Sequence, residues 1–206
     1  MLVISIVDSS FERTLEIAKQ YKFVELRLDE IDFSVNQIEQ IVEVSEKTII
    51  TGLLDCYNPF LVNIINDEKV IIDIPFDSLQ EQKNILDTFS VVEILVSYHR
   101  ENNSTELFNL NKIDSIIKKM IAINDEIKRI NYFKIAVTIN TEAEEKKYFS
   151  LFDKYPEIKG KLILIPFGKK FQYSRIKSLK LGSPLMYCYI DKPATECQLH
   201  YDEYEK

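Results

Sequence analysis

The chain has 206 residues, 46% apolar and 11% aromatic, which is enough for a substantial core, and we expect one domain over residues 1–206. It carries 33 acidic and 26 basic residues, for a net charge of -7, and it has no basic block that could neutralise phosphates. Nucleic acids and acidic membranes are therefore poor candidate partners.

Short apolar runs alternate along the chain with segments whose apolar residues recur every three or four positions, the pattern of repeated strand and helix. The expected strands cover residues 2–8, 22–29, 47–54, 69–76, 91–99, 132–139, 161–167 and 185–190. The expected helices cover residues 9–21, 34–45, 78–89, 106–123, 141–154 and 170–180, with a weaker one near 59–66.

Eight strands with seven connections predict an α/β fold of the (β/α)8 TIM-barrel type, closed on itself, compact, with trimmed loops and a shortened C-terminal helix. An open doubly wound sheet is the alternative. That fold usually binds a nucleotide on a glycine-rich loop, but the four glycines of this chain are not grouped. The sequence therefore favours the barrel.

The second expected strand has a charged face that carries Glu25 and Arg27, because side chains alternate with a period of two. Both faces of a barrel strand are covered, one by helices and one by the barrel interior, so these charges should line the interior. An ion pair between Glu25 and Arg27 that holds the barrel together is the structural alternative to a functional site.

Lys134 lies inside the apolar strand segment Phe-Lys-Ile-Ala-Val, and His99 ends another strand. A buried lysine without a partner tends to lose its proton and become a nucleophilic amine, as a Schiff base requires. The structural alternatives are a salt bridge between Lys134 and an interior carboxylate such as Glu93, and a purely structural His99. Barrels place their sites at the carboxyl ends of the strands, where these side chains could share one cavity.

The three cysteines, Cys56, Cys188 and Cys197, form no CxxC pair and have no histidine at zinc-ligand spacing. Reduced structural thiols are expected, and no metal is implied.

The apolar run at residues 2–7 is too short for a signal peptide and lacks a basic flank. We therefore expect a cytoplasmic protein.

Six short segments follow one another in the order found in a known family. They are Val-Glu-Leu-Arg-Leu-Asp at 24–29, Ser-Tyr-His at 97–99, Phe-Lys-Ile-Ala at 133–136, Ser-Arg-Ile at 174–176, Gly-Ser-Pro at 182–184 and the stretch 192–198. Over nearly its whole length the chain thereby resembles the type I 3-dehydroquinate dehydratase family.

The resemblance implies dehydration of 3-dehydroquinate to 3-dehydroshikimate, a shikimate-pathway step in aromatic amino acid biosynthesis. Lys134 matches the lysine that forms a Schiff base with the substrate ketone, and His99 matches the general acid and base. This elimination needs no metal and no redox cofactor. The family also suggests a homodimer.

Four further residues match substrate-binding positions of that family. Glu25 and Arg27 match a polar pair near the substrate hydroxyls and the reacting centre. Arg175 matches the arginine that binds the substrate carboxylate, and the flat fork of a guanidinium suits that task. Gln198 matches a glutamine on the loop after the last strand that contacts bound substrate.

The chain departs from the family in two places. The arginine expected after the third strand is absent from residues 51–58, where Asp55 is the candidate to replace the glutamate that orients the histidine. In the final loop only Gln198 is clearly kept. Loss of an arginine contact could reduce activity about 100-fold or more. A non-catalytic descendant that binds a metabolite or a protein partner, and another Schiff-base lyase of the class I aldolase kind, therefore remain alternatives.

Overall fold

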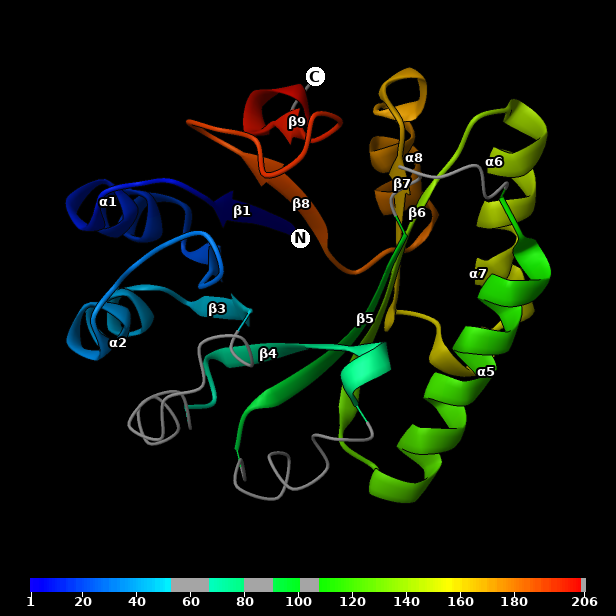
Figure 1. Ribbon diagram of the computed structural model, residues 1–206, viewed down its shortest axis with the longest axis horizontal. Helices are drawn as coiled ribbons and strands as arrows, with labels where there is room; N and C mark the ends of the chain where they lie inside the picture. Colours follow the sequence, from blue (N-terminus) through cyan, green and yellow to red (C-terminus); the bar gives the residue numbers. More distant parts are fainter. Residues whose placement is uncertain (53–66, 80–90, 101–107, 205–206) are drawn as a thin grey trace.

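A curled parallel sheet with helices on its outer side dominates the computed structural model, which describes residues 1–52, 67–79, 91–100 and 108–204 (Figure 1). Every hydrogen-bonded pair of neighbouring strands is parallel. The strands are β1 (Leu2–Ile6), β2 (Phe23–Arg27), β3 (Lys47–Thr51), β4 (Val70–Pro75), β5 (Glu93–Arg100), β6 (Ile130–Thr138), β7 (Leu162–Phe167), β8 (Met186–Tyr189) and β9 (Leu199–His200).

The predicted TIM-barrel fold is confirmed, and all eight expected strands are present within a few residues of their expected ends. The short strand β9 was not expected. In the order β7-β6-β5-β4-β3-β2-β1-β8-β9, strands β7 and β8 are not hydrogen-bonded to each other, so the expectation that the ring of strands closes on itself is wrong at this point. Side chains bridge this seam instead, because Ile165 and Phe167 of β7 belong to one buried cluster with Leu185 and Tyr187.

The helices cover the outer face of the sheet. They are α1 (Phe11–Tyr21), α2 (Val35–Val44), α5 (Leu110–Ile127), α6 (Glu142–Phe149), α7 (Leu151–Lys154) and α8 (Ser174–Leu181). After β9, the described residues form a 3-10 turn at Tyr201–Glu203. The expected helices near 59–66 and 78–89 fall wholly or largely outside the described residues.

Local sequence explains where the helices begin. The hydroxyl of Ser10 accepts a hydrogen bond from the backbone N–H of Arg13 at the start of α1. Ser34 and Gln37 form a reciprocal capping box at the start of α2. Such caps satisfy backbone donors that a helix leaves free at its first turn, and each contributes about 1 kcal/mol.

Strand alternation divides the core into two layers. Val24 and Leu26 of β2 face the helices in the larger cluster, whereas Phe23 faces the barrel interior. Each buried Leu, Ile or Phe side chain stabilises the fold by roughly 1.5–3 kcal/mol. The expected division of β2 into an apolar face and a charged interior face is therefore confirmed, and it directs Glu25 and Arg27 inward.

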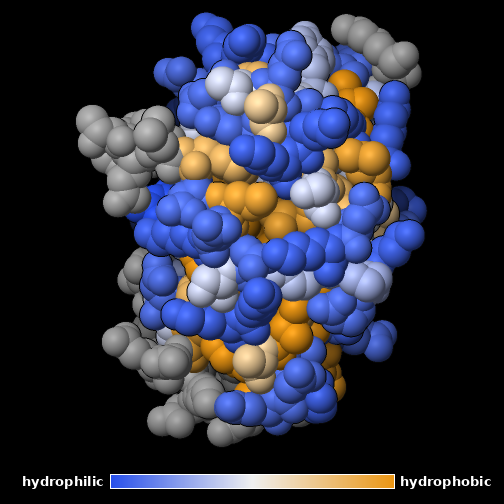
Figure 2. Space-filling model, turned by 90° about the vertical axis from the view of Figure 1, so that its right-hand side faces the viewer, coloured by the Kyte–Doolittle hydropathy of each residue, from blue (hydrophilic) through white to orange (hydrophobic). Residues whose placement is uncertain are grey.

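The face formed by α5 to α8 is mainly hydrophilic, and apolar side chains show in the hollows between the charged ones (Figure 2). Among the described residues no helix has the length and apolar character needed to cross a bilayer. The same residues contain no group of three or more His, Cys, Asp or Glu side chains placed to hold a metal ion.

Candidate active site

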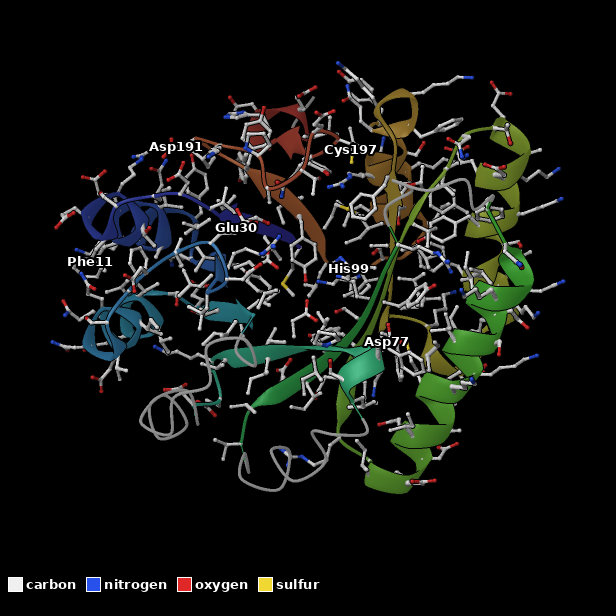
Figure 3. All side chains as sticks on the ribbon, in the orientation of Figure 1. Phe11, Glu30, Asp77, His99, Asp191 and Cys197 are labelled. Carbon is white, nitrogen blue, oxygen red and sulfur yellow. The ribbon has the colours of Figure 1, made fainter. Side chains whose placement is uncertain are left out.

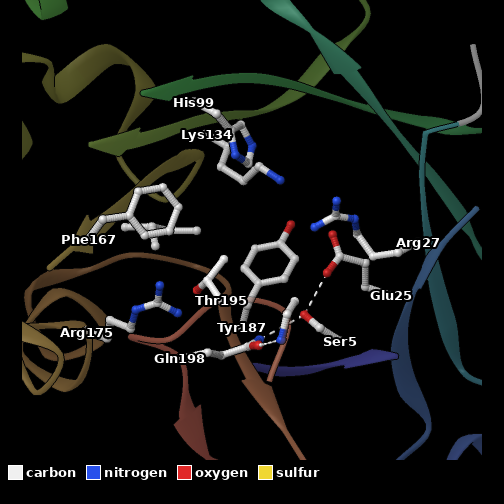
Figure 4. Close-up of a pocket in the computed structure, with 12 residues that line it drawn as sticks. Ser5, Glu25, Arg27, His99, Lys134, Phe167, Arg175, Tyr187, Thr195 and Gln198 are labelled. Carbon is white, nitrogen blue, oxygen red and sulfur yellow. Dashed lines mark hydrogen bonds between the residues drawn. The ribbon is translucent and has the colours of Figure 1, made fainter. Parts of the chain in front are cut away.

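A cavity of about 230 Å³ lies inside the curled sheet, between β1, β2, β5, β6, β7 and β8 (Figure 4). It is lined by Ser5, Glu25, Arg27, His99, Lys134, Ile165, Phe167, Arg175, Tyr187, Ala194, Thr195 and Gln198. All six residues expected to form a site are among these, although they are spread over 174 positions of sequence from Glu25 to Gln198, inclusive. The barrel fold brings them together.

Lys134 is only 2% exposed and forms a buried ion pair with Asp73 of β4. The alternative of a salt bridge between Lys134 and an interior carboxylate is therefore confirmed, but its partner is not Glu93, which pairs with Lys47, 2.7 Å away. The ammonium also lies 4.8 Å from the centre of the Tyr187 ring. The carboxylate that accompanies the lysine is thus Asp73, which sequence analysis missed.

Asp73 carries free hydrogen-bonding capacity beside the amine. Its Oδ2 contacts Lys134, while its Oδ1 is buried with no hydrogen-bond partner in the described part of the chain. Buried carboxylate oxygens are normally paired, so this orphan atom marks a position where a ligand donor could bind. The sequence signal was present, since Asp73 is the one charge in the apolar strand Val-Ile-Ile-Asp-Ile at 70–74.

His99 lies on the neighbouring strand and faces the same cavity. Its Cα is paired in register with Ala136, two residues beyond Lys134. Figure 3 shows His99 near the centre of the molecule. His99 is an exposed residue that lines the cavity. Partial desolvation of the ring, followed by the positive charge of Lys134, lowers the pKa of His99 to about 4, so the imidazole is neutral at pH 7.

The low pKa of His99 predicts a pH dependence of stability. The unfolded chain binds a proton at this histidine near its ordinary pKa of about 6.5, whereas the folded chain binds it only near pH 4. Between these values the unfolded state holds more protons, so the free energy of unfolding should fall as the pH falls from about 6.5 to about 4.

Urea unfolding across that pH range, for wild type and His99→Gln, measures this effect. The wild type should lose more stability than the variant as the pH falls. A His200→Gln variant, which changes a histidine outside the cavity, should keep the wild-type slope. Parallel curves for wild type and His99→Gln would contradict the assignment.

Glu25 is buried and held by hydroxyl groups. Ser5 Oγ donates to one carboxylate oxygen at 2.6 Å, and Thr51 Oγ1 donates to the other at 2.8 Å. Ser5 Oγ in turn accepts a hydrogen bond from Gln198 Nε2 at 3.0 Å, shown by dashed lines in Figure 4. The alternative of a Glu25–Arg27 ion pair is therefore wrong, and Glu25 remains an acceptor at the cavity wall.

Arg27 pairs instead with the loop that follows β2. Its Nε and a terminal nitrogen contact the two carboxylate oxygens of Asp29 at 3.0 and 2.6 Å, and Glu30 lies 3.0 Å away. The hydrogen bond from Arg27 lowers the pKa of Asp29, so the pair stays ionised. Gly52 permits this arrangement, because a Cβ there would lie 2.9 Å from the backbone nitrogen of Asp29.

Arg175 is a buried positive charge of the cavity. It is 2% exposed, yet within the described residues no carboxylate lies at ion-pair distance from it. Its Nε donates to the Pro166 carbonyl at 3.3 Å, and a terminal nitrogen lies 3.4 Å from Cys197 Sγ. A buried guanidinium without a counter-ion is costly unless an anion completes it. Arg175 therefore marks an anion-binding end of the cavity.

Gln198 also lies at the cavity, but its amide is occupied. Its Nε2 donates to Ser5 Oγ and to the Cys188 carbonyl at 3.0 and 3.1 Å, and its Oε1 accepts from Ala194 N–H at 2.7 Å. These bonds tie the final loop to β1 and β8. In this arrangement Gln198 holds the cavity wall in place and has no free donor for a ligand.

The charges of the cavity are separated along its length. In Figure 4 Arg175 lies at one side, and Glu25 and Arg27 lie at the other, with Lys134 and His99 between and above them. This arrangement suits a small ligand that carries an anion at one end, hydrogen-bond donors at the other and an electrophilic carbon near Lys134. Asp55, the expected partner of the histidine, falls outside the described residues.

Similar proteins share the fold and much of the length of this chain. No protein-family model matches it. A protein of Archaeoglobus fulgidus named 3-dehydroquinate dehydratase is 23% identical, with 92% of this chain and 89% of the relative covered. The resemblance to the 3-dehydroquinate dehydratases is confirmed.

Solved 3-dehydroquinate dehydratases have the same architecture. The enzyme from Aquifex aeolicus superposes with a TM-score of 0.74 at 21% identity, over 100% of this chain and 95% of its own. A type I 3-dehydroquinate dehydratase from Clostridium difficile, carrying covalently modified comenic acid, gives a TM-score of 0.74 at 16% identity, over 99% of this chain and 89% of its own. At these identities the structural likenesses establish the fold.

Proposed function

We propose that this chain is a type I 3-dehydroquinate dehydratase, a hydro-lyase that forms 3-dehydroshikimate through a Schiff base on Lys134. The convergence of Lys134, His99 and Arg175 on one cavity carries this proposal. The substrate is inferred from the resemblance. 3-Dehydroquinate is a ring that bears a carboxylate, a ketone and several hydroxyl groups.

Arg175 and Glu25 would orient this substrate. The guanidinium of Arg175, which contacts Pro166 and Cys197 but no carboxylate of the described residues, takes the substrate carboxylate through two parallel hydrogen bonds from its terminal nitrogens. Glu25 accepts hydrogen bonds from ring hydroxyls at the opposite end of the cavity, because Ser5 and Thr51 occupy only part of its acceptor capacity. With both ends fixed, the ketone faces Lys134.

Lys134 then forms the covalent intermediate. The Lys134 ammonium gives a proton to the Asp73 carboxylate, and the resulting amine attacks the ketone carbon. The carbinolamine then loses its oxygen as water, which takes up that proton, to give an iminium ion. The Asp73 carboxylate, which already contacts this nitrogen, balances the positive charge of the iminium. The iminium withdraws electrons from the adjacent carbon and acidifies its proton.

His99 would move the protons of the elimination. The neutral imidazole takes the acidified proton from the carbon next to the iminium, which leaves an enamine. The enamine then expels the hydroxyl group on the following carbon, and the protonated His99 returns its proton to that leaving oxygen as water. A second water hydrolyses the product imine and restores the Lys134 amine.

An ultraviolet assay tests the proposal, since the product is a conjugated enone and the substrate is not. Purified protein mixed with 3-dehydroquinate should raise the enone absorbance, and the His99→Gln variant should be slower by about 100-fold or more. No turnover by well-folded protein would favour a non-catalytic descendant. Turnover of a different keto acid alone would favour a Schiff-base lyase of the aldolase kind.

A further inference from the structure

Tyr187 presents a hydroxyl group to the cavity that the mechanism above does not use. The residue lies on β8, lines the cavity and is 5% exposed. Its hydroxyl oxygen is buried and has no hydrogen-bond partner among the described residues. In Figure 4 this oxygen points away from β8, toward the part of the cavity bordered by Lys134, Glu25 and Arg27.

A buried tyrosine hydroxyl normally finds a partner within the protein, because leaving it unpaired destabilises the fold. Tyr148 of the same chain follows that rule, since its hydroxyl donates to the Ile135 carbonyl at 2.7 Å. Tyr187 does not follow it, although the oxygen acceptors of Glu25 line the same cavity. A ligand bound in the cavity can supply the missing partner.

The position of the ring places this hydroxyl near the reacting nitrogen. Lys134 Nζ lies 4.8 Å from the centre of the Tyr187 ring, so the ring face supports the amine while its edge carries the hydroxyl into the cavity. Burial, with the nearby charges of Glu25 and Asp73, raises the pKa of Tyr187 well above 10. The phenol therefore stays protonated and acts as a hydrogen-bond donor.

We propose that the Tyr187 hydroxyl donates a hydrogen bond to the substrate oxygen on the carbon that Lys134 attacks. This inference rests on the proposed function and adds a catalytic residue to it. As the amine adds, the ketone oxygen gains negative charge, and a fixed donor stabilises it. The same bond then holds the carbinolamine hydroxyl, which departs as water with a proton supplied from elsewhere, so Tyr187 keeps its own proton.

The variant Tyr187→Phe tests the proposal because it removes only the hydroxyl. We expect kcat/KM for 3-dehydroquinate to fall about 10- to 100-fold, and the rate of borohydride-trapped adduct formation to fall by a similar factor. Meanwhile the melting temperature of the ligand-free protein should stay the same or rise, because no protein hydrogen bond is lost. A purely structural tyrosine would show the opposite pattern.

Tyr148→Phe is the matched control, since it removes a hydroxyl that has a protein partner. It should lower the melting temperature and leave kcat/KM within twofold. Tyr187→Phe with unchanged kcat/KM, or with a loss of activity explained by unfolding, would overturn the role of Tyr187 alone. A wild type that neither turns over nor traps 3-dehydroquinate would overturn the proposed function, and the role of Tyr187 with it.

Discussion

Replacing Lys134 with methionine should abolish turnover of 3-dehydroquinate, lowering kcat by at least about 10⁴-fold. Methionine fills most of the volume of the lysine stem but supplies no amine, so neither the imine nor its electron withdrawal can form. Steady-state kinetics on the enone absorbance measures the effect. Residual activity within 100-fold of wild type would show that the chemistry does not pass through this nitrogen.

Stability has to be controlled in this experiment. Lys134→Met alone leaves Asp73 buried and unpaired, a change that costs about 3–5 kcal/mol. The double variant Lys134→Met with Asp73→Asn removes both charges and should recover most of that loss while remaining inactive. Lys47→Met is the matched lysine control, because Lys47 forms an ion pair with Glu93 outside the cavity. It should retain activity within a fewfold of wild type.

Replacing Arg175 with glutamine should lower kcat/KM about 100- to 1000-fold, mainly by raising KM. Two charge-assisted hydrogen bonds to the substrate carboxylate are lost, each contributing roughly 1.5–3 kcal/mol. The free energy of unfolding should change little or increase, because the described structure gives this buried cation no counter-ion. Kinetics and urea unfolding on the same preparation separate the two effects.

Two further arginine variants sharpen that result. Arg175→Lys keeps the positive charge but loses the parallel N–H donors of the guanidinium. Its KM should therefore lie between that of wild type and that of Arg175→Gln. Arg13→Gln removes an exposed ion pair with Asp191, 2.7 Å away and outside the cavity, and it should leave KM unchanged. A normal KM in Arg175→Gln would contradict the assignment of this residue as the anion site.

The fold could be predicted from sequence because barrel strands have a strong periodic signal. The alternation of side chains in β2 correctly predicted that Glu25 and Arg27 face the interior, and the six expected site residues line one cavity. What the alternation cannot give is which charged side chains pair with each other. It did not show that Lys134 pairs with Asp73, or that Arg27 pairs with Asp29, because register and rotamer decide those contacts.

Tyr187 and Ser5 were missed for a related reason. Tyrosine and serine are common in buried strands, so nothing in their local sequence separates a cavity-lining hydroxyl from a core one. The structure separates them by geometry. Ser5 links Glu25 to Gln198, and the hydroxyl of Tyr187 has no partner among the residues that the structure describes. The open seam between β7 and β8 likewise depends on strand register, which periodicity does not encode.

Borohydride reduction in the presence of 3-dehydroquinate tests the central claim most directly, because it converts an imine into a stable amine at the residue that formed it. Peptide mass spectrometry should find the reduced substrate attached to Lys134 in wild type, and no adduct in the double variant lacking Lys134 and Asp73. Well-folded wild-type protein that forms no adduct while it dehydrates the substrate, or that carries the adduct on another lysine, would contradict this account.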